Sequence, residues 1–581
     1  MKRRTMQKTL ALTLAAVTAA GALAGCGGSG DQAKTDSAAA QESGEAKEAE
    51  SAQEGTAAES AEGAEITPGA GMSAWEPFEE NVTLTIPVYD RGQEGVPAIG
   101  ENYWESYIQE NFADAYNITM KFVPITRSDV LTAYSLLAAG NELPTVLMEY
   151  DYPKQAQWVS DGYLTPYDMQ EFAEIAPTYY QAMIDNGVMD YTNMGGECYF
   201  ALAKNPYYDT GYSWVTFYRQ DWLTQVGYDA YPETWAEEKE MLLKIKEAGI
   251  CEYPLGGQMV TGAGVDQNYA FRTFPLDELD WAMYGDFGIP ALGNEANRKL
   301  VKRENEKFNL GLTDPEYYIT DAETAKANFI NGKSIMYGSY ISSNMDWLNS
   351  FYQQNPDADV KVKMQVTTED PEGGTVPAVR SANPFGMMIG FSSQASEDEI
   401  KAAMMYMEWM IQEDTLYTMQ WGFEGENYTV GEDGIPASVA DYSGEHKQGY
   451  NNNQDYWCIV KQGREVGTIE DLIRVNSPQG LPKDFTQEII DNYYNLRKIA
   501  DEGWAITDCN FSVAIDSVAE YQATLLSLYT EYRDKLTMCT PEEFDALYDE
   551  LAQDYADAGF AEIAEERKEA FEAGNSTRLA Q

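Results

Sequence analysis

Hydrophobic and polar positions alternate along the first part of the chain in a way that predicts strands and helices in turn. Residues 82–88, Val-Thr-Leu-Thr-Ile-Pro-Val, alternate apolar and polar side chains, which predicts a strand. We expect a helix over residues 103–115, a second strand over residues 118–123, a helix that runs to Ala139, and a short strand over residues 145–148. This order predicts parallel strands joined by crossover helices, so the expected fold class is α/β.

Later segments carry clear helix-start signals. Thr234 followed by Glu237 forms a capping box, which predicts a helix that continues through Ile245. Thr540-Pro541 combines an N-cap residue with proline at the first helical position, and apolar stripes follow it. The C-terminal region is therefore expected to be mostly helical.

The N-terminus has the pattern of a secretory leader. Lys2, Arg3, Arg4 and Lys8 precede an uncharged apolar run over residues 10–22. An apolar run of about 7–15 residues fits a signal peptide and is too short to span a bilayer. Residues 23–26, Leu-Ala-Gly-Cys, resemble the lipobox of bacterial lipoproteins, so residues 1–25 are expected to be removed and Cys26 to carry a lipid. The alternative is an ordinary signal peptide with a chance cysteine.

The segment over residues 26–74 is predicted to be an acidic, disordered tether. Residues 27–71 contain no aromatic residue and one isoleucine, and their acids outnumber Lys34 and Lys47. Such a composition cannot bury enough apolar surface to offset the entropy of ordering. A random coil of this length typically reaches about 35–40 Å. This reach suits a domain held outside the cell by its lipid anchor alone.

Composition limits the possible partners and the domain count. The formal net charge is −56, which argues against nucleic acid and against adsorption to anionic lipid. The part that begins at Trp75 is too long for one ordinary core, so two or more lobes are expected. Beyond Cys26, five scattered cysteines lack any C-x-x-C spacing, and no pairing among them can be assigned: Cys198, Cys251, Cys458, Cys509 and Cys539.

The sequence gives little support for most classes of enzyme. His446 is the one histidine of the chain, and no G-x-S-x-G motif is present. Metal sites that need several histidines are excluded by this count. A lipid-anchored glycoside hydrolase stays open, because it needs only two suitably placed carboxylates.

Four segments, in this order, resemble family 1 extracellular solute-binding proteins. They are Tyr218–Gly227 with Tyr231–Trp235, Phe329–Met336, Trp421–Tyr428 with Gly431–Gly434, and the C-terminal segment that begins at Glu542. The third resembles a signature of the large Gram-positive lipoprotein branch that serves ABC importers of oligosaccharides.

The resemblance implies a two-lobed, periplasmic-binding-protein-like fold of type II, with a hinge between the lobes and a helical C-terminal region. The first lobe would comprise residues 76–212 plus about 356–390, and the second 213–355 plus about 391–575. It further implies a monomer that closes on its ligand, is read by the transmembrane subunits of an ABC permease, and is no enzyme. No cofactor is expected, and no metal, because the EF-hand-like calcium loop of some relatives has no counterpart here.

Candidate ligand residues combine aromatic faces for sugar rings with acids for hydroxyl groups, since 12% of the chain is aromatic. Loops after strands are favoured, because ligands of open α/β sheets meet the strands' carboxyl ends. Asp90 and Arg91 follow the first predicted strand, and Arg380 would suit a uronate. Trp281 and Tyr284 lie in an aromatic, glycine-rich stretch. The resemblance adds the remaining candidates, in loops after strands and in the branch signature: Glu149, Tyr150, Asp151, Tyr340, Trp421 and Glu424.

The sequence thus predicts a lipid-anchored receptor on the outer face of the cell membrane that captures an oligosaccharide between two lobes for an ABC importer. Three alternatives remain open. They are a glycoside hydrolase, a binding protein for a peptide or other organic solute, and an adhesin without lobe closure.

Overall fold

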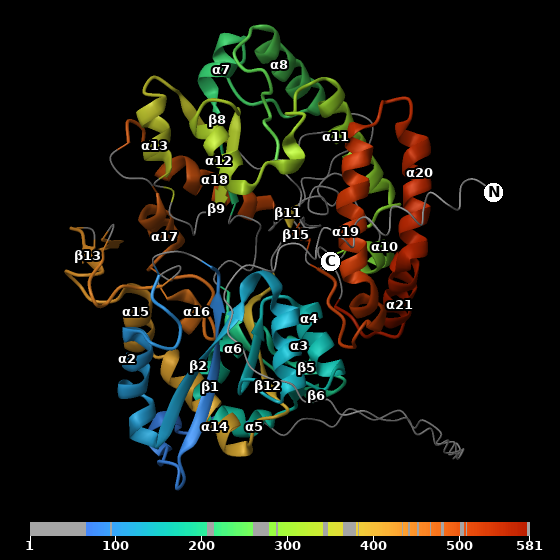
Figure 1. Ribbon diagram of the computed structural model, residues 1–581. Coiled ribbons are helices and arrows are strands. Elements are labelled where there is room, and N and C mark those ends of the chain that lie inside the picture. The colour runs from blue at the N-terminus through green and yellow to red at the C-terminus, as the bar shows by residue number, and fades with distance from the viewer. Residues whose placement is uncertain are drawn as a thin grey trace, which may run out of the picture. The chain divides into compact units, whose positions relative to one another are not determined.

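The computed structural model describes most of the chain beyond residue 65 (Figure 1). Contacts divide the chain into Met1–Ala64 and a compact unit, Glu65–Gln581. The predicted leader, Cys26 and most of the predicted tether lie outside the described residues. These are 66–92, 96–205, 214–258, 278–285, 289–340, 345, 347–363, 379–380, 383–432, 434–439, 442–449, 453–464, 466–477, 481–499, 505–506 and 508–577.

Two parallel strands open the fold, as the alternating pattern predicts. β1 (Val82–Asp90) pairs with β2 (Ile118–Thr126) along its whole length, in parallel register. α2 (Tyr103–Asn111) connects them, and α3 (Val130–Gly140) follows β2. α2 is shorter than expected, because a 3₁₀ turn over Ala113–Tyr116 takes up its predicted last residues.

The third predicted strand, β3 (Val146–Glu149), finds its ladder partner far along the chain. It pairs antiparallel with β12 (Phe385–Ser392), which also pairs with β7 (Phe200–Lys204) and β4 (Leu164–Thr165). Thr145 still lies beside β1, since its backbone N–H donates to the carbonyl of Thr85 at 2.9 Å. The expected parallel order therefore holds for β1 and β2, while the ladder of β3 is antiparallel.

The largest hydrophobic core surrounds this first sheet. Every residue of β12 is buried, and α14 (Glu397–Met410) packs against β1. This core contains residues between Val82 and Ala203 and between Phe385 and Val460. The structure thus places buried residues between Phe391 and Met419 and between Tyr456 and Val460 in this core, whereas the sequence analysis assigned about 391–575 to the second lobe. The reason is that β12 leads directly into α14, which packs against β1.

A second sheet is antiparallel, with β8 (Trp214–Arg219) between β9 (Met336–Tyr340) and β10 (Val360–Lys363). Phe329 and Phe351 stack in its core with ring centroids 4.8 Å apart. Thr234 caps α8 as predicted, since its side chain accepts a hydrogen bond from the N–H of Glu237. The surrounding helices are α7 (Gln220–Gln225), α8 (Trp235–Glu247), α12 (Ala322–Ile330), α13 (Trp347–Gln354), α17 (Ile469–Asn476) and α18 (Thr486–Ile499).

The C-terminal region is helical, as predicted, and its long helices pack together (Figure 1). α20 begins at Phe544, later than expected, because residues 541–543 form a turn in which the Thr540 hydroxyl donates to Glu543 at 2.8 Å. The helices here are α10 (Glu278–Tyr284), α11 (Glu295–Asn309), α19 (Asp516–Met538), α20 (Phe544–Tyr555) and α21 (Ala561–Glu572), with a π turn over Ala556–Phe560.

Segments from distant parts of the chain meet where β7 ends and β12 begins. The carbonyl of Lys204 accepts a hydrogen bond from the N–H of Gln462 at 2.7 Å. The buried Asn205 amide donates to the carbonyl of Asn383 at 3.3 Å, and the amide of Asn510 donates to the Asn383 side chain at 2.9 Å. We name these contacts, with Gly386, the junction.

The remaining elements are short. They are α4 (Tyr152–Ser160), α5 (Met169–Ile175), α6 (Pro177–Asp185), α15 (Glu413–Trp421), α16 (Gln454–Trp457), β5 (Asn193–Met194), β6 (Glu197–Cys198), β11 (Val379–Arg380), β13 (Tyr428–Val430), β14 (Pro436–Ser438) and β15 (Ala505–Ile506), with 3₁₀ turns over Gly71–Ala74, Arg127–Asp129, Met189–Thr192 and Tyr317–Ile319. Cys198, Cys251, Cys458 and Cys539 are free thiols.

Candidate ligand-binding site

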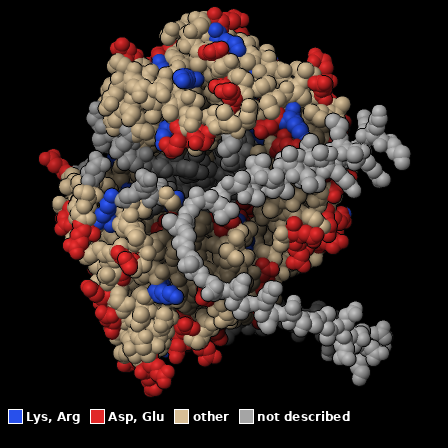
Figure 2. Space-filling model, in the orientation of Figure 1, with Lys and Arg blue, Asp and Glu red and all other residues tan. Residues whose placement is uncertain are grey.

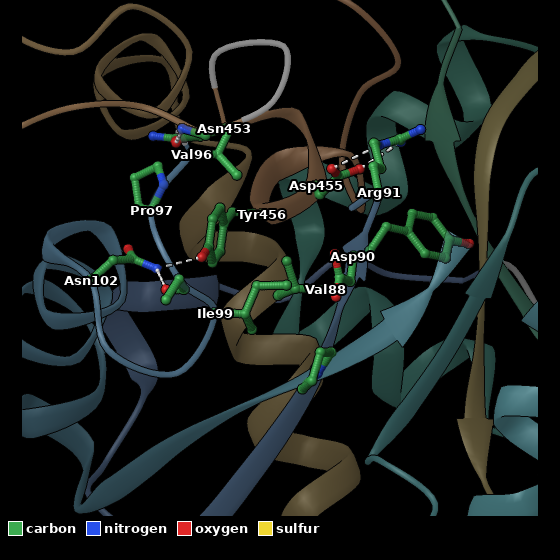
Figure 3. A pocket seen from close by; sticks show the side chains of 14 residues that line it. Val88, Asp90, Arg91, Val96, Pro97, Ile99, Asn102, Asn453, Asp455 and Tyr456 are labelled. Atoms are coloured by element: carbon green, nitrogen blue, oxygen red, sulfur yellow. Dashed lines mark hydrogen bonds and ion pairs between the residues drawn. The ribbon is translucent and has the colours of Figure 1, made fainter. Parts of the chain in front are cut away.

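A pocket lies at the carboxyl ends of β1 and β2, where α/β sheets commonly bind ligands (Figure 3). Its volume is about 340 Å³, within the usual range of about 300–1,000 Å³ for small-molecule sites. Apolar side chains and a few polar groups line it together: Val88, Tyr89, Asp90, Arg91, Val96, Pro97, Ala98, Ile99, Asn102, Pro124, Gly449, Asn453, Asp455 and Tyr456. Apolar walls with sparse polar groups are typical of sites for small organic molecules.

One side of the pocket is a two-bonded ion pair between Arg91 and Asp455 (Figure 3). The Nε of Arg91 donates to Oδ2 at 3.1 Å, and its Nη2 donates to Oδ1 at 2.8 Å. Burial raises the pKa of Asp455, while the guanidinium opposes that rise. The pair joins the end of β1 to α16, so it fixes the position of α16 at this edge of the sheet.

The opposite side is a buried hydrogen-bond network around Tyr456. Its hydroxyl accepts from Nδ2 of Asn102 at 2.7 Å and donates to Oε1 of Glu105 at 2.8 Å. The side-chain oxygen of Asn102 also caps α2, because it accepts from the N–H groups of Trp104 and Glu105. The start of α2 and the end of α16 are thereby held together.

Asn453 supplies a donor that the protein does not use. Its side chain is buried, and its Oδ1 accepts from the N–H of Gly449 at 2.7 Å. Its Nδ2 is buried and has no hydrogen-bond partner among the described residues, and Asn453 is one of the residues that line the pocket. A buried amide donor without an acceptor costs about 1–3 kcal/mol, so a ligand oxygen or a water bound there would be stabilised.

Glu105 gives the pocket wall a pH dependence. Burial raises the pKa of Glu105, against the hydrogen bonds from Gly100 and Tyr456. The folded protein therefore keeps this proton to a higher pH than the unfolded chain, and charging the group lowers stability as the pH rises above the ordinary glutamate range. The substitution Glu105→Gln should stabilise the protein more at pH 8 than at pH 5, measured by thermal unfolding.

The control is Glu110→Gln, which changes an exposed acid on the same helix. Because Glu110 is exposed, its substitution should change the unfolding temperature at pH 8 by less than Glu105→Gln does. A Glu105→Gln effect that is larger at pH 5 would contradict the raised pKa.

Two predicted ligand residues, Asp90 and Arg91, line the pocket. Three others lie beside it. Glu149 is buried in an ion pair with Arg127 at 3.1 Å, and Asp151 lies 3.3 Å from Lys154. The Tyr150 hydroxyl accepts from Nε2 of Gln454 at 3.3 Å.

The other predicted residues lie away from this pocket. Trp281 is buried in a core with Phe511 and Phe571, and Tyr284 stacks on Phe560 at 6.2 Å. Trp421 is also buried, with the Arg464 guanidinium 3.9 Å from its ring centroid, while Glu424 is exposed. The side chains of Tyr340, at the end of β9, and Arg380, in β11, lie outside the description.

Sequence reasoning missed the rest of the lining, including the polar residues Asn102, Asn453, Asp455 and Tyr456. The signal for Asn102 was available, because asparagine directly before the predicted helix over residues 103–115 is a typical N-cap. The other three belong to α16 and the residue before it, and no local pattern connects that segment with β1.

The described residues contain no group of three or more histidine, cysteine or acidic side chains placed to hold a metal ion. None of the helices in this part of the chain has the length and apolar character needed to cross a membrane.

The fold, and the pocket at the carboxyl ends of β1 and β2, are of the kind that suits a small solute. Residues 98–415, more than half of the chain, match the family model described as bacterial extracellular solute-binding protein. The chain therefore belongs to this family of non-catalytic, extracellular binding proteins.

Solved structures support the same fold. The alginate-binding protein AlgQ2 without calcium is 14% identical, with a TM-score of 0.59 over 86% of this chain and 99% of that one. A solute-binding protein from Bifidobacterium longum infantis, described as binding HMO and as associated with an ABC transporter, is 14% identical, with a TM-score of 0.58 over 85% and 99%. Substrate-binding protein FusA of S. pneumoniae, in complex with kestose, is 12% identical, with a TM-score of 0.54 over 85% and 99%. Among curated proteins, none is similar enough to count as a match.

Proposed function

We propose that this protein is a lipid-anchored receptor that captures an oligosaccharide between two lobes and delivers it to an ABC importer. The pocket beside β1 carries the proposal, since it combines the unused donor of Asn453 with the exposed carboxylate of Asp90. A donor and an acceptor beside apolar walls suit a ring with hydroxyl groups. The sugar ligands named for the structural neighbours, and the importer named for two of them, support this proposal.

The anchor and the lobes belong to the same proposal. The lipobox-like residues 23–26 and the acidic segment after them support a lipid on Cys26 and a tether of the predicted kind. The junction supports a hinge, because four separate segments of the chain meet there, at Lys204–Asn205, Asn383, Gln462 and Asn510. Expression of the full chain should yield a membrane-bound form that Cys26→Ser releases.

The direct test is a glycan and peptide panel screened by thermal shift on Glu65–Gln581. We expect at least one oligosaccharide to raise the unfolding temperature and to be recovered intact. Cleavage of that glycan would contradict the receptor, and a response to peptides alone would contradict the sugar.

Asn453→Gly tests the donor itself. Because Asn453 has a φ of 63°, glycine tolerates its backbone conformation. Loss of the donor should weaken sugar binding about tenfold, measured by titration calorimetry. The matched control is Asn117→Gly, at a φ of 58° and outside the pocket, which should leave the affinity unchanged. Equal affinities of the Asn453 variant and the parent protein for the sugar would show that the Asn453 amide does not contribute to binding.

A further inference from the structure

Basic side chains at the carboxyl edge of the first sheet are already matched by acids. Arg91 makes two hydrogen bonds to Asp455, and Arg127 lies 3.1 Å from Glu149. Lys154 lies 3.3 Å from Asp151 and 3.9 Å from Glu149. These cations are therefore poorly placed to attract a second carboxylate, because each would have to share its charge with the acid it holds.

Asp90 is the acid of this edge that has no basic partner among the described residues. Its side chain is exposed in the pocket, and its Oδ1 accepts only the N–H of Gly92, at 2.9 Å. The pocket thus presents an uncompensated carboxylate to a ligand (Figure 3). The whole chain has the same sign, with 95 acids against 39 lysines and arginines, and Figure 2 shows acidic side chains over much of the face it draws.

Asn453 gives independent support for a binding site at this edge. Its side chain is 1% exposed and lines the pocket, and its Nδ2 lacks a partner in the described part of the chain. This donor needs an acceptor, which a sugar hydroxyl or ring oxygen provides without carrying any charge. At Asn453 the pocket offers a hydrogen-bond donor to an uncharged ligand oxygen. At Asp90 it attracts a positively charged group of the ligand.

We infer that the pocket selects its solute by charge: it binds amine-bearing and neutral saccharides and rejects uronates. This inference rests on the proposed function and names the substrate class of the same site. A uronate carboxylate near Asp90 meets a like charge, so its affinity should be at least about tenfold weaker than that of the neutral saccharide. An amine should bind as tightly or up to about fivefold more tightly, since exposed ion pairs are weak. The sequence analysis assigned Arg380 a role only if the ligand were a uronate. The charges at this pocket favour amine-bearing and neutral saccharides instead.

The experiment uses Glu65–Gln581 and a mixed library of neutral, amine-bearing and uronate oligosaccharides of several linkages. Native mass spectrometry reads which saccharides bind, and calorimetry measures the affinities of matched neutral, amine-bearing and uronate forms. We expect neutral and amine-bearing adducts, and a discrimination against uronates that shrinks at high salt. A uronate that binds as tightly as its neutral counterpart overturns the inference while the receptor stands. A library without any adduct overturns the proposed function, and the inference with it.

Asp90→Asn tests whether the Asp90 carboxylate causes the discrimination against uronates. Asparagine keeps the oxygen that accepts from Gly92, so the loop is expected to hold its shape. The discrimination between uronate and neutral saccharide should narrow by about fivefold. Asp185→Asn, at the exposed end of α6 and outside the pocket, should leave it unchanged. An unchanged discrimination in the Asp90 variant would contradict the inference.

Discussion

Replacing Asp455 with alanine should destabilise the protein by up to about 3 kcal/mol, because it leaves the partly buried Arg91 guanidinium without its partner. Asp455 is 5% exposed, and both of its oxygens hold the Arg91 guanidinium. The loss also frees α16 from β1, so the affinity for saccharide should fall with the stability. Urea unfolding followed by tryptophan fluorescence measures the first effect, and calorimetry the second.

Two variants provide the comparison. Asp455→Asn keeps an acceptor for Arg91 and should lose less stability than the alanine variant. Glu531→Ala removes an exposed ion pair with Lys535 on α19 and should change stability by less than about 1 kcal/mol. If Asp455→Ala costs no more than Glu531→Ala, the ion pair does not hold the pocket together.

Gly386→Ala should destabilise the junction by about 1–3 kcal/mol, as overpacking of a filled site does. A Cβ at Gly386 would lie 2.7 Å from the Cβ of Gln462 and 3.2 Å from the carbonyl oxygen of Lys204. Because Gln462 and Lys204 belong to the segments that meet at the junction, we also expect the variant to alter lobe closure. Unfolding and small-angle scattering with saturating ligand measure the two effects.

The matched control is Gly140→Ala at the last position of α3. There a Cβ meets nothing closer than 3.6 Å, and alanine favours helix, so stability should stay equal or rise by up to about 1 kcal/mol. A Gly386 variant as stable as the Gly140 variant would show that the junction accommodates the added methyl group, contrary to the distances above.

Local patterns were enough to predict β1, β2 and β3 and the helices between them. The alternation in residues 82–88 and the stop at Gly140-Asn141 depend only on neighbouring residues, and β1 and α3 follow them. The place of β12 could not be predicted in this way, because its partners β3 and β7 lie nearly two hundred or more residues earlier. For the same reason residues 391–460 were assigned to the second lobe.

The candidate site was predictable only on its β1 side. Asp90 and Arg91 follow a recognisable strand, and the rule that ligands meet strand ends selects them. Asp455 and Tyr456 reach the pocket through α16, a short helix whose position depends on contacts with Arg91 and Asn102. Aromatic content was a weaker guide, since Trp281 and Trp421 fill cores instead.

The proposed function requires two lobes that close on an unaltered saccharide. Small-angle scattering of Glu65–Gln581, with and without the saccharide identified by thermal shift, measures this closure. We expect a smaller radius of gyration when the sugar is bound, with the sugar recovered whole. An unchanged scattering profile at saturating sugar would contradict it.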